Sequence, residues 1–254
     1  IHSATGIVTV ADGSLLDHEQ ATTHSIQVRA TSLDGSTAVR NFTIQIGDLN
    51  DTPPVIVPNQ QFSVSELAMI GTSVGNVVAT DADTVGTPQN WTITGGNVDG
   101  IFSIDPATGH IAVADATRLD FEMTSVYTLT VTVSDGVTVS APQTIRILVL
   151  DQNESPVFSG APVLSVNENS AGGTVVGSVS ATDQDRADSL TYSIISSNPV
   201  SAFAIDAVSG QIQVINSSML NYEAMTSITL SIRVTDTGGL TDTQLITISI
   251  NDVN

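Results

Sequence analysis

The sequence predicts an all-β protein, built as a linear array of tandem Greek-key β-sandwich repeats of about 100 residues each. Three observations predict this fold class. Short acidic motifs return in the same order after about 100 residues, the segments between them alternate apolar and hydroxyl side chains, and Gly or Asp-Gly turns separate these segments. At 254 residues, the chain has room for two complete domains and part of a third.

The acidic motifs set the register of the repeats. Leu-Asp/Asn-x-Glu occurs at residues 16–19, 119–122 and 220–223. Asp-x-Asn-Asp/Glu occurs at residues 48–51 and 151–154, and its beginning recurs at 252–254. These registers predict three domains, which we call repeats one, two and three: the C-terminal half of a repeat at 1–51, a complete repeat at 52–154 and a complete repeat at 155–254.

Repeat one is expected to be incomplete. Ile1 aligns with Ile104 and Ile205, so this repeat lacks roughly its first half. Half a sandwich cannot cover its own core and leaves a sheet edge open to other strands. We therefore expect the chain to be a piece of a longer protein, or the half repeat to share strands with another copy.

The strands of the complete repeats are indicated by alternation of apolar and hydroxyl residues. Residues 127–133 read Tyr-Thr-Leu-Thr-Val-Thr-Val, and residues 228–234 read Ile-Thr-Leu-Ser-Ile-Arg-Val. Residues 143–150 and 244–250 alternate again before each linker. About seven such strands per repeat predict a Greek-key sandwich, with at most a single helical turn after each Leu-Asp/Asn-x-Glu motif.

The composition favours a metal cation over other partners. The net charge is −20, and all six basic residues are Arg. Such an acidic surface repels nucleic acid and anionic lipid, and no apolar run is long enough for a membrane span, so we expect neither nucleic-acid binding nor direct membrane insertion. The absence of Cys excludes disulfides and thiolate-bound metals, which leaves packing or an oxygen-bound metal to stiffen the domains.

Taken together, these motifs resemble the cadherin family, and the resemblance covers nearly the whole chain. The matching features are glutamates in the first strand of each complete repeat, paired aspartates, the Leu-Asp/Asn-x-Glu segments, an Asp-x-Gly segment and the acidic linkers. In this sequence they are Val64-Ser65-Glu66, Val166-Asn167-Glu168, Asp81-x-Asp83, Asp183-x-Asp185, Asp236-Thr237-Gly238 and the Leu-Asp/Asn-x-Glu and linker motifs given above. The lack of Lys and Cys is more similar to the bacterial branch, which favours a bacterial surface protein or large adhesin.

The resemblance implies immunoglobulin-like sandwiches with calcium between successive repeats, about two to three Ca²⁺ ions for each complete junction. The preceding repeat would supply its strand glutamate, its Leu-Asp-x-Glu acids and its linker, and the following repeat its Asp-x-Asp and Asp-x-Gly acids. For the junction of repeats one and two, the implied ligands are Asp17, Glu19, Asn50, Asp51, Asp81, Asp83, Asn90 and Asp135. For the junction of repeats two and three, they are Glu66, Asp120, Glu122, Gln152, Asn153, Glu154, Asp183, Asp185, Asp188 and Asp236.

Physical chemistry supports this implication independently. Ca²⁺ binds six to eight carboxylate, amide and carbonyl oxygens in flexible geometry. Without the ion, clustered carboxylates repel one another by about 1 kcal/mol per pair, even in a water-like dielectric. Asn221 replaces the acid of its motif, so the half-site formed by Glu168, Asn221 and Glu223 is expected to be weak.

The tryptophan and the histidines could also be taken for binding residues. Trp91 could be a sugar-binding platform, but it aligns with Leu190 at the start of a strand and is expected in the core. The four histidines, His2, His18, His24 and His110, do not recur between repeats and are expected to be surface residues without a metal.

Two functions remain open on the sequence alone, and neither is enzymatic. No nucleophile elbow, phosphate loop or His-Glu-x-x-His motif occurs, and acids that recur in every repeat suit a scaffold better than a single cleft. The favoured function is a calcium-dependent adhesion and spacer module, on the cell surface or secreted, with homotypic repeats or a surface protein as partner. The alternative is a calcium-dependent polysaccharide-binding module, which would require an exposed aromatic cluster.

Overall fold

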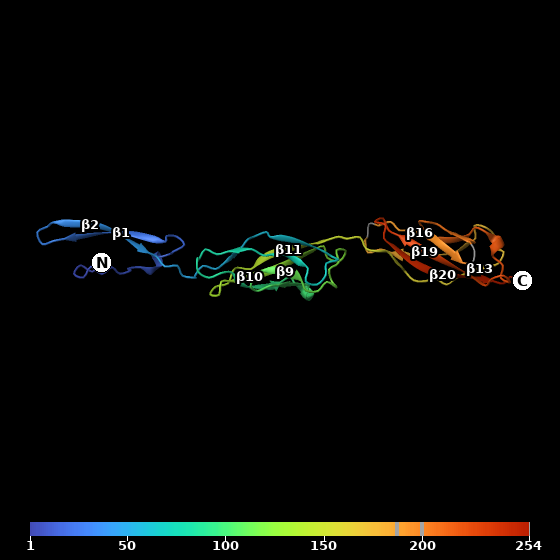
Figure 1. Cartoon of the computed structure of the whole chain (residues 1–254), viewed down its shortest axis with the longest axis horizontal. Coiled ribbons are helices and arrows are strands. Elements are labelled where there is room, and N and C mark those ends of the chain that lie inside the picture. The colour runs from blue at the N-terminus through green and yellow to red at the C-terminus, as the bar shows by residue number, and fades with distance from the viewer. Residues whose placement is uncertain (186–187, 199–200, 254) are drawn as a thin grey trace. The chain divides into compact units, whose positions relative to one another are not determined.

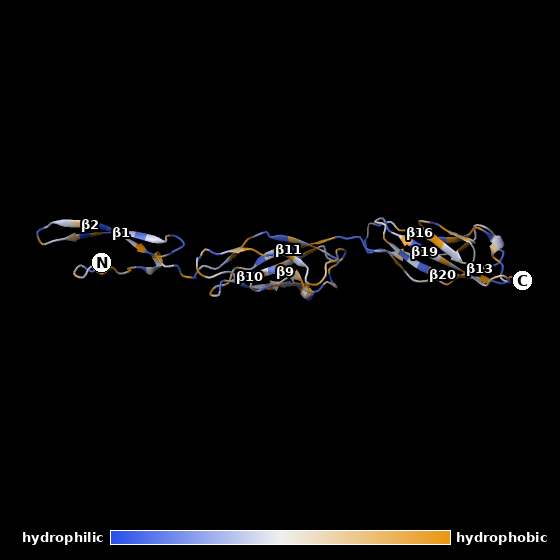
Figure 2. Cartoon of the chain, in the orientation of Figure 1, coloured by the Kyte–Doolittle hydropathy of each residue, from blue (hydrophilic) through white to orange (hydrophobic). Residues whose placement is uncertain are grey.

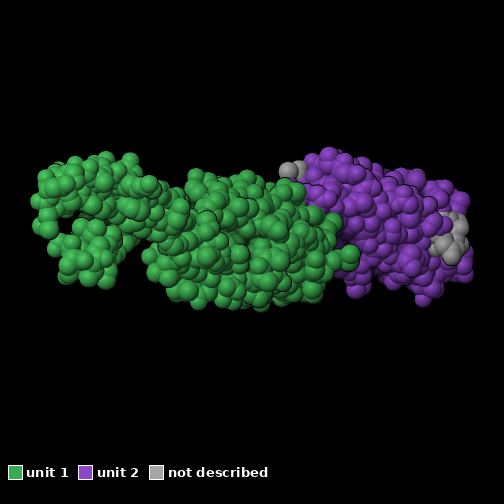
Figure 3. All heavy atoms as spheres, turned by 60° about the vertical axis from the view of Figure 1, so that its left-hand side comes forward, with its two compact units in different colours: residues 1–150 green, residues 151–254 purple. Residues whose placement is uncertain are grey.

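A computed structural model describes residues 1–185, 188–198 and 201–253. The chain forms two compact units, residues 1–150 and residues 151–254 (Figure 3). The described residues include no helix that is both long and apolar enough to cross a membrane. The domain boundaries expected after residues 51 and 154 stay predictions.

Residues 52–150 form a β-sandwich. A four-stranded sheet has the order β4-β11-β10-β7, and a three-stranded sheet has the order β5-β9-β8, with β3 and β6 paired separately. The strands are β3 (Val55–Ile56), β4 (Gln61–Ser65), β5 (Ser73–Asn76), β6 (Ala79–Thr80), β7 (Gln89–Gly95), β8 (Phe102–Ile104), β9 (His110–Val113), β10 (Val126–Ser134) and β11 (Gln143–Leu150). Strand β4 runs parallel to β11, whereas the other pairs within these sheets are antiparallel.

Repeat three repeats this topology strand for strand. Its larger sheet has the order β13-β20-β19-β16, its smaller sheet the order β14-β18-β17, and β12 pairs with β15. The strands are β12 (Val157–Phe158), β13 (Leu164–Asn167), β14 (Val175–Ser178), β15 (Ala181–Thr182), β16 (Thr191–Asn198), β17 (Phe203–Ile205), β18 (Gln211–Val214), β19 (Ser227–Thr235) and β20 (Thr241–Asn251). The first long strand, β13, is again parallel to the last, β20. The prediction of tandem all-β sandwich repeats is therefore confirmed.

Each complete repeat has more strand segments than the seven predicted, because its first two strands are interrupted. Pro58 and Asn59 separate β3 from β4; Pro58 has no N–H to donate, and Asn59 has a positive φ of 60°. In repeat three, Gly160, with φ 122°, and Pro162 separate β12 from β13. In both repeats the first strand can therefore pair with one sheet before the break and with the other sheet after it.

The alternating sequences bury one face of each central strand. Along β10, Leu129, Val131 and Val133 are fully buried and the residues between them are not, and β19 buries its apolar residues in the same way. Hydrophobic and hydrophilic positions accordingly mix along the strands of both repeats (Figure 2). Trp91 on β7 is 5% exposed and belongs to the core of repeat two, as predicted.

Residues 1–50 contain one two-stranded sheet, formed by β1 (Thr23–Thr31) and β2 (Thr37–Gln45) (Figure 1). A short 3₁₀ turn, η1 (Gly13–Leu15), precedes it; η2 (Val98–Gly100) and η3 (Ser217–Met219) are the 3₁₀ turns of the other repeats. No residue of this segment is buried, and Phe42 on β2 is 51% exposed. As expected, this segment does not cover an apolar core of its own.

Substitutions at equivalent core positions of repeats two and three test whether the two repeats unfold independently. Leu129 and Leu230 are both fully buried, so Leu129→Ala and Leu230→Ala should each cost about 2–5 kcal/mol of unfolding free energy. Because the two residues belong to separate cores, each substitution should lower only one of two calorimetric transitions. If either substitution lowered both transitions equally, the repeats would not unfold as independent units.

Candidate metal sites

The Asp or Asn of each Leu-Asp/Asn-x-Glu motif caps a turn of backbone. The side-chain Oδ1 accepts a hydrogen bond from the N–H three residues later, at 2.9 Å for Asp17, 2.8 Å for Asp120 and 3.0 Å for Asn221. The backbone then closes a single turn from residue i to residue i+4. Because Asn can make the same bond, its presence at position 221 is compatible with the fold even where the charge is lost.

The strand glutamates hold this turn against the sheet. Glu66, which is 5% exposed, accepts a hydrogen bond from the backbone N–H of Phe121 at 2.7 Å. Glu168 makes the equivalent bond with Tyr222 at 3.1 Å and a second bond with the N–H of Val253. Buried carboxylates are therefore part of the architecture at the end of each complete repeat.

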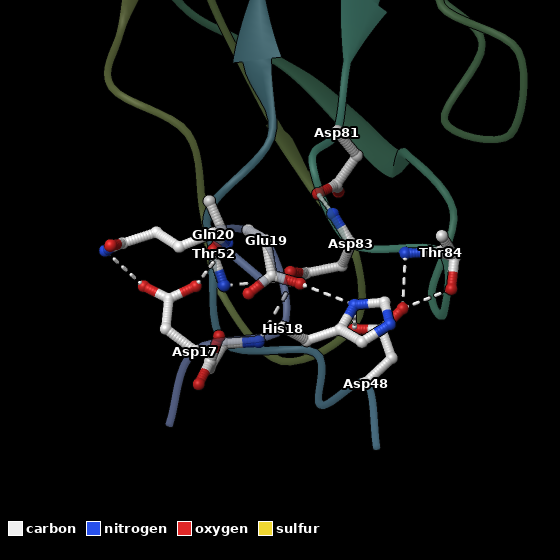
Figure 4. Close-up of polar contacts among 10 residues, drawn as sticks. Asp17, His18, Glu19, Gln20, Asp48, Thr52, Asp81, Asp83 and Thr84 are labelled. Carbon is white, nitrogen blue, oxygen red and sulfur yellow. Dashed lines mark hydrogen bonds and ion pairs between the residues drawn. The ribbon is translucent and has the colours of Figure 1, made fainter. Parts of the chain in front are cut away.

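The linker after repeat one approaches the paired aspartates of repeat two (Figure 4). The backbone N–H groups of Asp51 and Thr52 both donate to Asp83 Oδ2 at 3.0 Å. Asp81 Oδ1 accepts from the N–H of Asp83 at 3.2 Å. Each aspartate thus uses one oxygen to organise backbone, while Asp81 Oδ2 and Asp83 Oδ1 are buried without a hydrogen bond.

Repeat three contains the same arrangement within its own unit. The N–H of Glu154 donates to Asp185 Oδ2 at 2.8 Å, and the N–H of Asp185 donates to Asp183 Oδ1 at 3.1 Å. Asp183 Oδ2 is buried without a hydrogen bond. Asp188 accepts from the N–H of Thr237 at 3.3 Å, which ties it to the Asp-x-Gly loop.

The linker asparagines contact the acids of the 135 and 236 loops. Asn153 donates to Asp236 Oδ2 at 2.8 Å, and Asn50, in the amide orientation that satisfies its neighbours, donates to Asp135 Oδ2 at 3.0 Å. Gly238 is required for this packing, because a Cβ there would lie 2.1 Å from the Asn153 amide oxygen.

Among the described residues, several groups of three carboxylates have oxygens within 4.8 Å of one another inside a single unit. Each combines acids that are far apart in the sequence. They include Glu19, Asp51 and Asp83; Glu66, Asp120 and Glu122; and Glu168, Glu223 and Asp252. In the first of these groups, Asp83 Oδ1 is buried without a hydrogen bond, and clustered carboxylate oxygens of this kind suit Ca²⁺, which prefers several oxygens in flexible geometry.

Some predicted ligands are not brought into these groups. Asn90, the second residue of β7, has φ 55° and is exposed, and it is not part of the described hydrogen-bond network around Asp83. Both carboxylate oxygens of Asp17 accept hydrogen bonds from Gln20. Gln152 is exposed, and its amide donates to the carbonyl of Asp151.

Two residues at the first junction were missed by the sequence analysis. Asp48 lies beside His18 and Glu19, and its Oδ2 accepts from the N–H of Thr84 at 2.7 Å and from the Thr84 hydroxyl. Its recurrence as Asp151 and Asp252 in the linker motif was the signal that could have identified it. His18 was expected at the surface; its side chain is 19% exposed and therefore partly buried, with Glu19 at 3.3 Å and Asp48 of the linker at 3.7 Å.

Local interactions shift the acidity of several of these groups. Burial raises the pKa of Asp183, and the charges of Asp185, Asp188 and Asp236 raise it further. Burial opposes but does not prevent a lowered pKa at Asp135, which accepts hydrogen bonds from Thr138 and Val137. The hydrogen bond from the Thr84 hydroxyl lowers the pKa of Asp48.

Comparison with known proteins identifies the family. The family described as "Cadherin domain" matches residues 60–150 and 162–251. The chain belongs to the cadherin family. Among curated cadherins, it is 33% identical over its whole length to mouse "Cadherin EGF LAG seven-pass G-type receptor 2", 32% identical over 94% of its length to human "Protocadherin Fat 1", and 37% identical over 73% of its length to chicken "Cadherin-1".

The solved structures agree with the fold. The structure of mouse Cadherin-23 EC22-24 matches 93% of the chain at 28% identity and a TM-score of 0.68, with 77% of that structure covered. The structure of PcdhgB3 EC1-4 matches 94% of the chain with a TM-score of 0.72, at 23% identity and with 59% of that structure covered. As a member of the cadherin family, the chain is extracellular.

The chain spans only 9%, 5% and 22% of the three curated relatives named above. These relatives come from mouse, human and chicken, so the bacterial source that was expected from the lack of Lys and Cys finds no support.

The raised pKa of Asp183 predicts a pH dependence in the calcium-free chain. The folded state binds the proton of Asp183 more tightly than the unfolded state, so this contribution to stability is complete below pH 3.8 and is lost as the pH rises through the raised pKa. Asp183→Asn should therefore stabilise repeat three at pH 7 in chelator, and the gain should vanish below pH 3.8, as measured by denaturant unfolding across pH.

Asp206→Asn is the matched control in the same repeat. Hydrogen bonds from Ser209 lower the pKa of Asp206, so neutralising it should destabilise repeat three at pH 7. If Asp183→Asn destabilised the metal-free chain as Asp206→Asn does, the account of burial and charge repulsion at Asp183 would be wrong.

Proposed function

We propose that this chain is a calcium-dependent adhesion and spacer module, in which Ca²⁺ at the junctions between repeats stiffens an extracellular array of cadherin domains. Membership in the cadherin family supports an adhesive role in place of an enzymatic one. The recurrence of the acidic motifs supports a scaffold with equivalent sites along its length.

The single observation that carries the proposal is that Asp83 and Asp183 each use one carboxylate oxygen to bind backbone N–H and leave the other oxygen buried without a hydrogen bond. In repeat two, one oxygen of Asp83 holds the linker backbone and the other is buried without a hydrogen bond. In repeat three, Asp183 likewise uses one oxygen on backbone and leaves the other buried without a hydrogen bond. A buried carboxylate oxygen without a donor is costly, and a divalent cation would remove that cost.

Electrostatics supports the same proposal. The groups of carboxylates have no Lys to balance them, since the chain contains none, and two of the six Arg residues, Arg29 and Arg40, lie on the hairpin of repeat one. Like charges within 4.8 Å repel, so the metal-free junction is expected to open and the calcium-bound junction to close.

The proposed ligands follow from the groups described above. At the junction of repeats one and two they are Glu19, Asn50, Asp51, Asp81, Asp83 and Asp135, joined by Asp48. By the register of the repeats, the second linker would use Glu66, Asp120, Glu122, Asn153, Glu154, Asp183, Asp185 and Asp236. Ca²⁺ would supply positive charge that draws the linker and loop acids together. Hydrogen bonds from the linker N–H groups to Asp83 and Asp185 already hold the linker backbone beside these acids.

The proposed partner is another cadherin array, including a second copy of this chain. One solved neighbour at 22% identity is titled a protocadherin gammaB7 cis-dimer, which shows that this fold can present surfaces to a like partner. A polysaccharide partner is not favoured, because Trp91, the only tryptophan, is buried in the core.

Removing one ligand should weaken calcium binding. Asp83→Asn keeps an oxygen for the linker N–H groups but removes a charge, so calorimetry should show calcium affinity at the first junction falling about tenfold or more. The same substitution, or chelation of the unmodified chain, should broaden the distribution of radii of gyration in X-ray scattering.

Asp105→Asn is the charge-matched control, because Asp105 lies in a turn after β8 and bonds to Thr108. Unchanged calcium affinity in Asp83→Asn would rule out the proposed ligand role, and an equal loss in Asp105→Asn would show that only net charge matters.

Adhesion is tested with coated beads. Beads carrying the full chain should aggregate in millimolar Ca²⁺ and disperse when a chelator is added, because only the closed junctions present a fixed binding surface. A glycan array probed with and without Ca²⁺ should remain silent. Calcium-dependent binding to the array, with beads that never aggregate, would replace adhesion by polysaccharide recognition.

A further inference from the structure

Three segments of the chain have the Asn-x-Ser/Thr pattern that N-glycosylation requires. They are Asn41-Phe42-Thr43, Asn90-Trp91-Thr92 and Asn216-Ser217-Ser218. The family places the chain outside the cell, and the relatives named above are animal proteins, so the pattern occurs in a setting where it is used. Because a glycan is bulky, it needs an asparagine that the fold leaves at the surface.

Hydrogen bonds of the fold account for two of the three asparagines. Asn216 caps η3, since its Oδ1 accepts from the N–H of Ser218 at 3.2 Å and from the Ser218 hydroxyl at 2.8 Å. Asp115 caps the equivalent turn of repeat two, so this position requires a capping oxygen whether or not a glycan is attached. Asn41 Oδ1 accepts from Gln27 Nε2 at 3.2 Å across the hairpin of β1 and β2.

Asn90 differs from both, because no hydrogen bond within the described part of the chain uses its side chain. Asn90 and Thr92 are exposed, whereas Trp91 between them is 5% exposed. The Thr92 hydroxyl donates to the carbonyl oxygen of Asn90 at 3.2 Å, so the two residues that define the pattern lie together at the surface. We propose that Asn90 carries an N-linked glycan.

A β-bulge accounts for the exposure of Asn90. In the pairing of β7 with β10, Asn90 and Trp91 lie opposite the single residue Val133. Asn90, the first residue of the bulge, has a φ of 55°, in the left-handed region that Asn adopts more readily than most residues. This backbone conformation lets Trp91 enter the core while the residue before it stays exposed, and it leaves the side-chain amide of Asn90 available for modification.

The position of Asn90 in the sheet gives the glycan a structural role. Strand β7 is the outer strand of the four-stranded sheet, so one edge of its backbone pairs with no strand of that sheet. It contains neither a charged residue nor a proline, which commonly keep an edge from pairing with another chain. A hollow lined by Asn90, Pro88 and Pro106, among others, offers space beside the amide for the first sugar. The glycan would therefore cover this edge and leave contacts between arrays to other faces.

The modification is a glycosyl transfer to an amide nitrogen. The donor class is an oligosaccharide carried on a lipid diphosphate, which the secretory pathway supplies. Asn90 Nδ2 forms a bond to the anomeric carbon of the first sugar, and the bond from that carbon to the diphosphate oxygen breaks. The amide nitrogen gives up one proton, and the lipid diphosphate leaves with the electron pair, so nothing is oxidised or reduced.

The test is secretion of the full chain from cultured animal cells, followed by peptide mass spectrometry. A peptide N-glycosidase removes an N-linked glycan and converts its asparagine to aspartate, so position 90 should be read as aspartate after treatment. Asn90→Gln and Thr92→Val should each abolish the glycan at this position, because they remove the amide acceptor and the required hydroxyl. Thr92→Ser keeps the hydroxyl and should retain the glycan.

Asn216→Gln is the matched control and should leave the glycan at position 90 unchanged. Because Thr92→Val keeps Asn90 itself, its result does not depend on how the bulge tolerates a glutamine. Asn90 recovered unmodified from the secreted chain, while another secreted glycoprotein of the same cells carries its glycans, would overturn the proposal. A modification at position 90 that survives Thr92→Val would overturn it as well.

Discussion

The structure around each linker depends on hydrogen bonds between extended backbone and the second aspartate of an Asp-x-Asp pair. Asp83 accepts from two successive N–H groups of the linker, and Asp185 accepts from the N–H of Glu154. These bonds determine which carboxylate oxygens are engaged and which stay available. The linker is therefore an ordered element even though it belongs to no sheet.

This constraint explains why the same acids can serve architecture and binding together. Asp17, Asp120 and Asn221 cap equivalent turns, and Glu66 and Glu168 hold equivalent turns against the strands. Exchange of Asp for Asn preserves the cap and removes only charge. Variation in binding strength along the array can thus arise without any change of fold.

The sequence allowed the sandwich, the Trp91 core position and the acids around Asp83 to be predicted. The reason is that these features recur at equivalent positions of the repeats, whereas the residues between them vary. It did not reveal His18 and Asp48, since a histidine without counterparts in other repeats looks like surface variation. Asn90 was expected near Asp83 from its spacing, but it lies inside β7 with a positive φ and is exposed. The position of such a side chain depends on the local backbone conformation, which cannot be predicted from the spacing of residues along the chain.

The parallel pairing of the first long strand with the last has a mechanical consequence. In repeat two, β4 enters the sheet beside β11, from which the chain leaves, and β13 and β20 do the same in repeat three. A pull applied to the two ends of a repeat therefore loads this ladder lengthwise, so that its hydrogen bonds must break together and not one by one. Tension along such an array would be resisted within each sandwich by shear between its terminal strands.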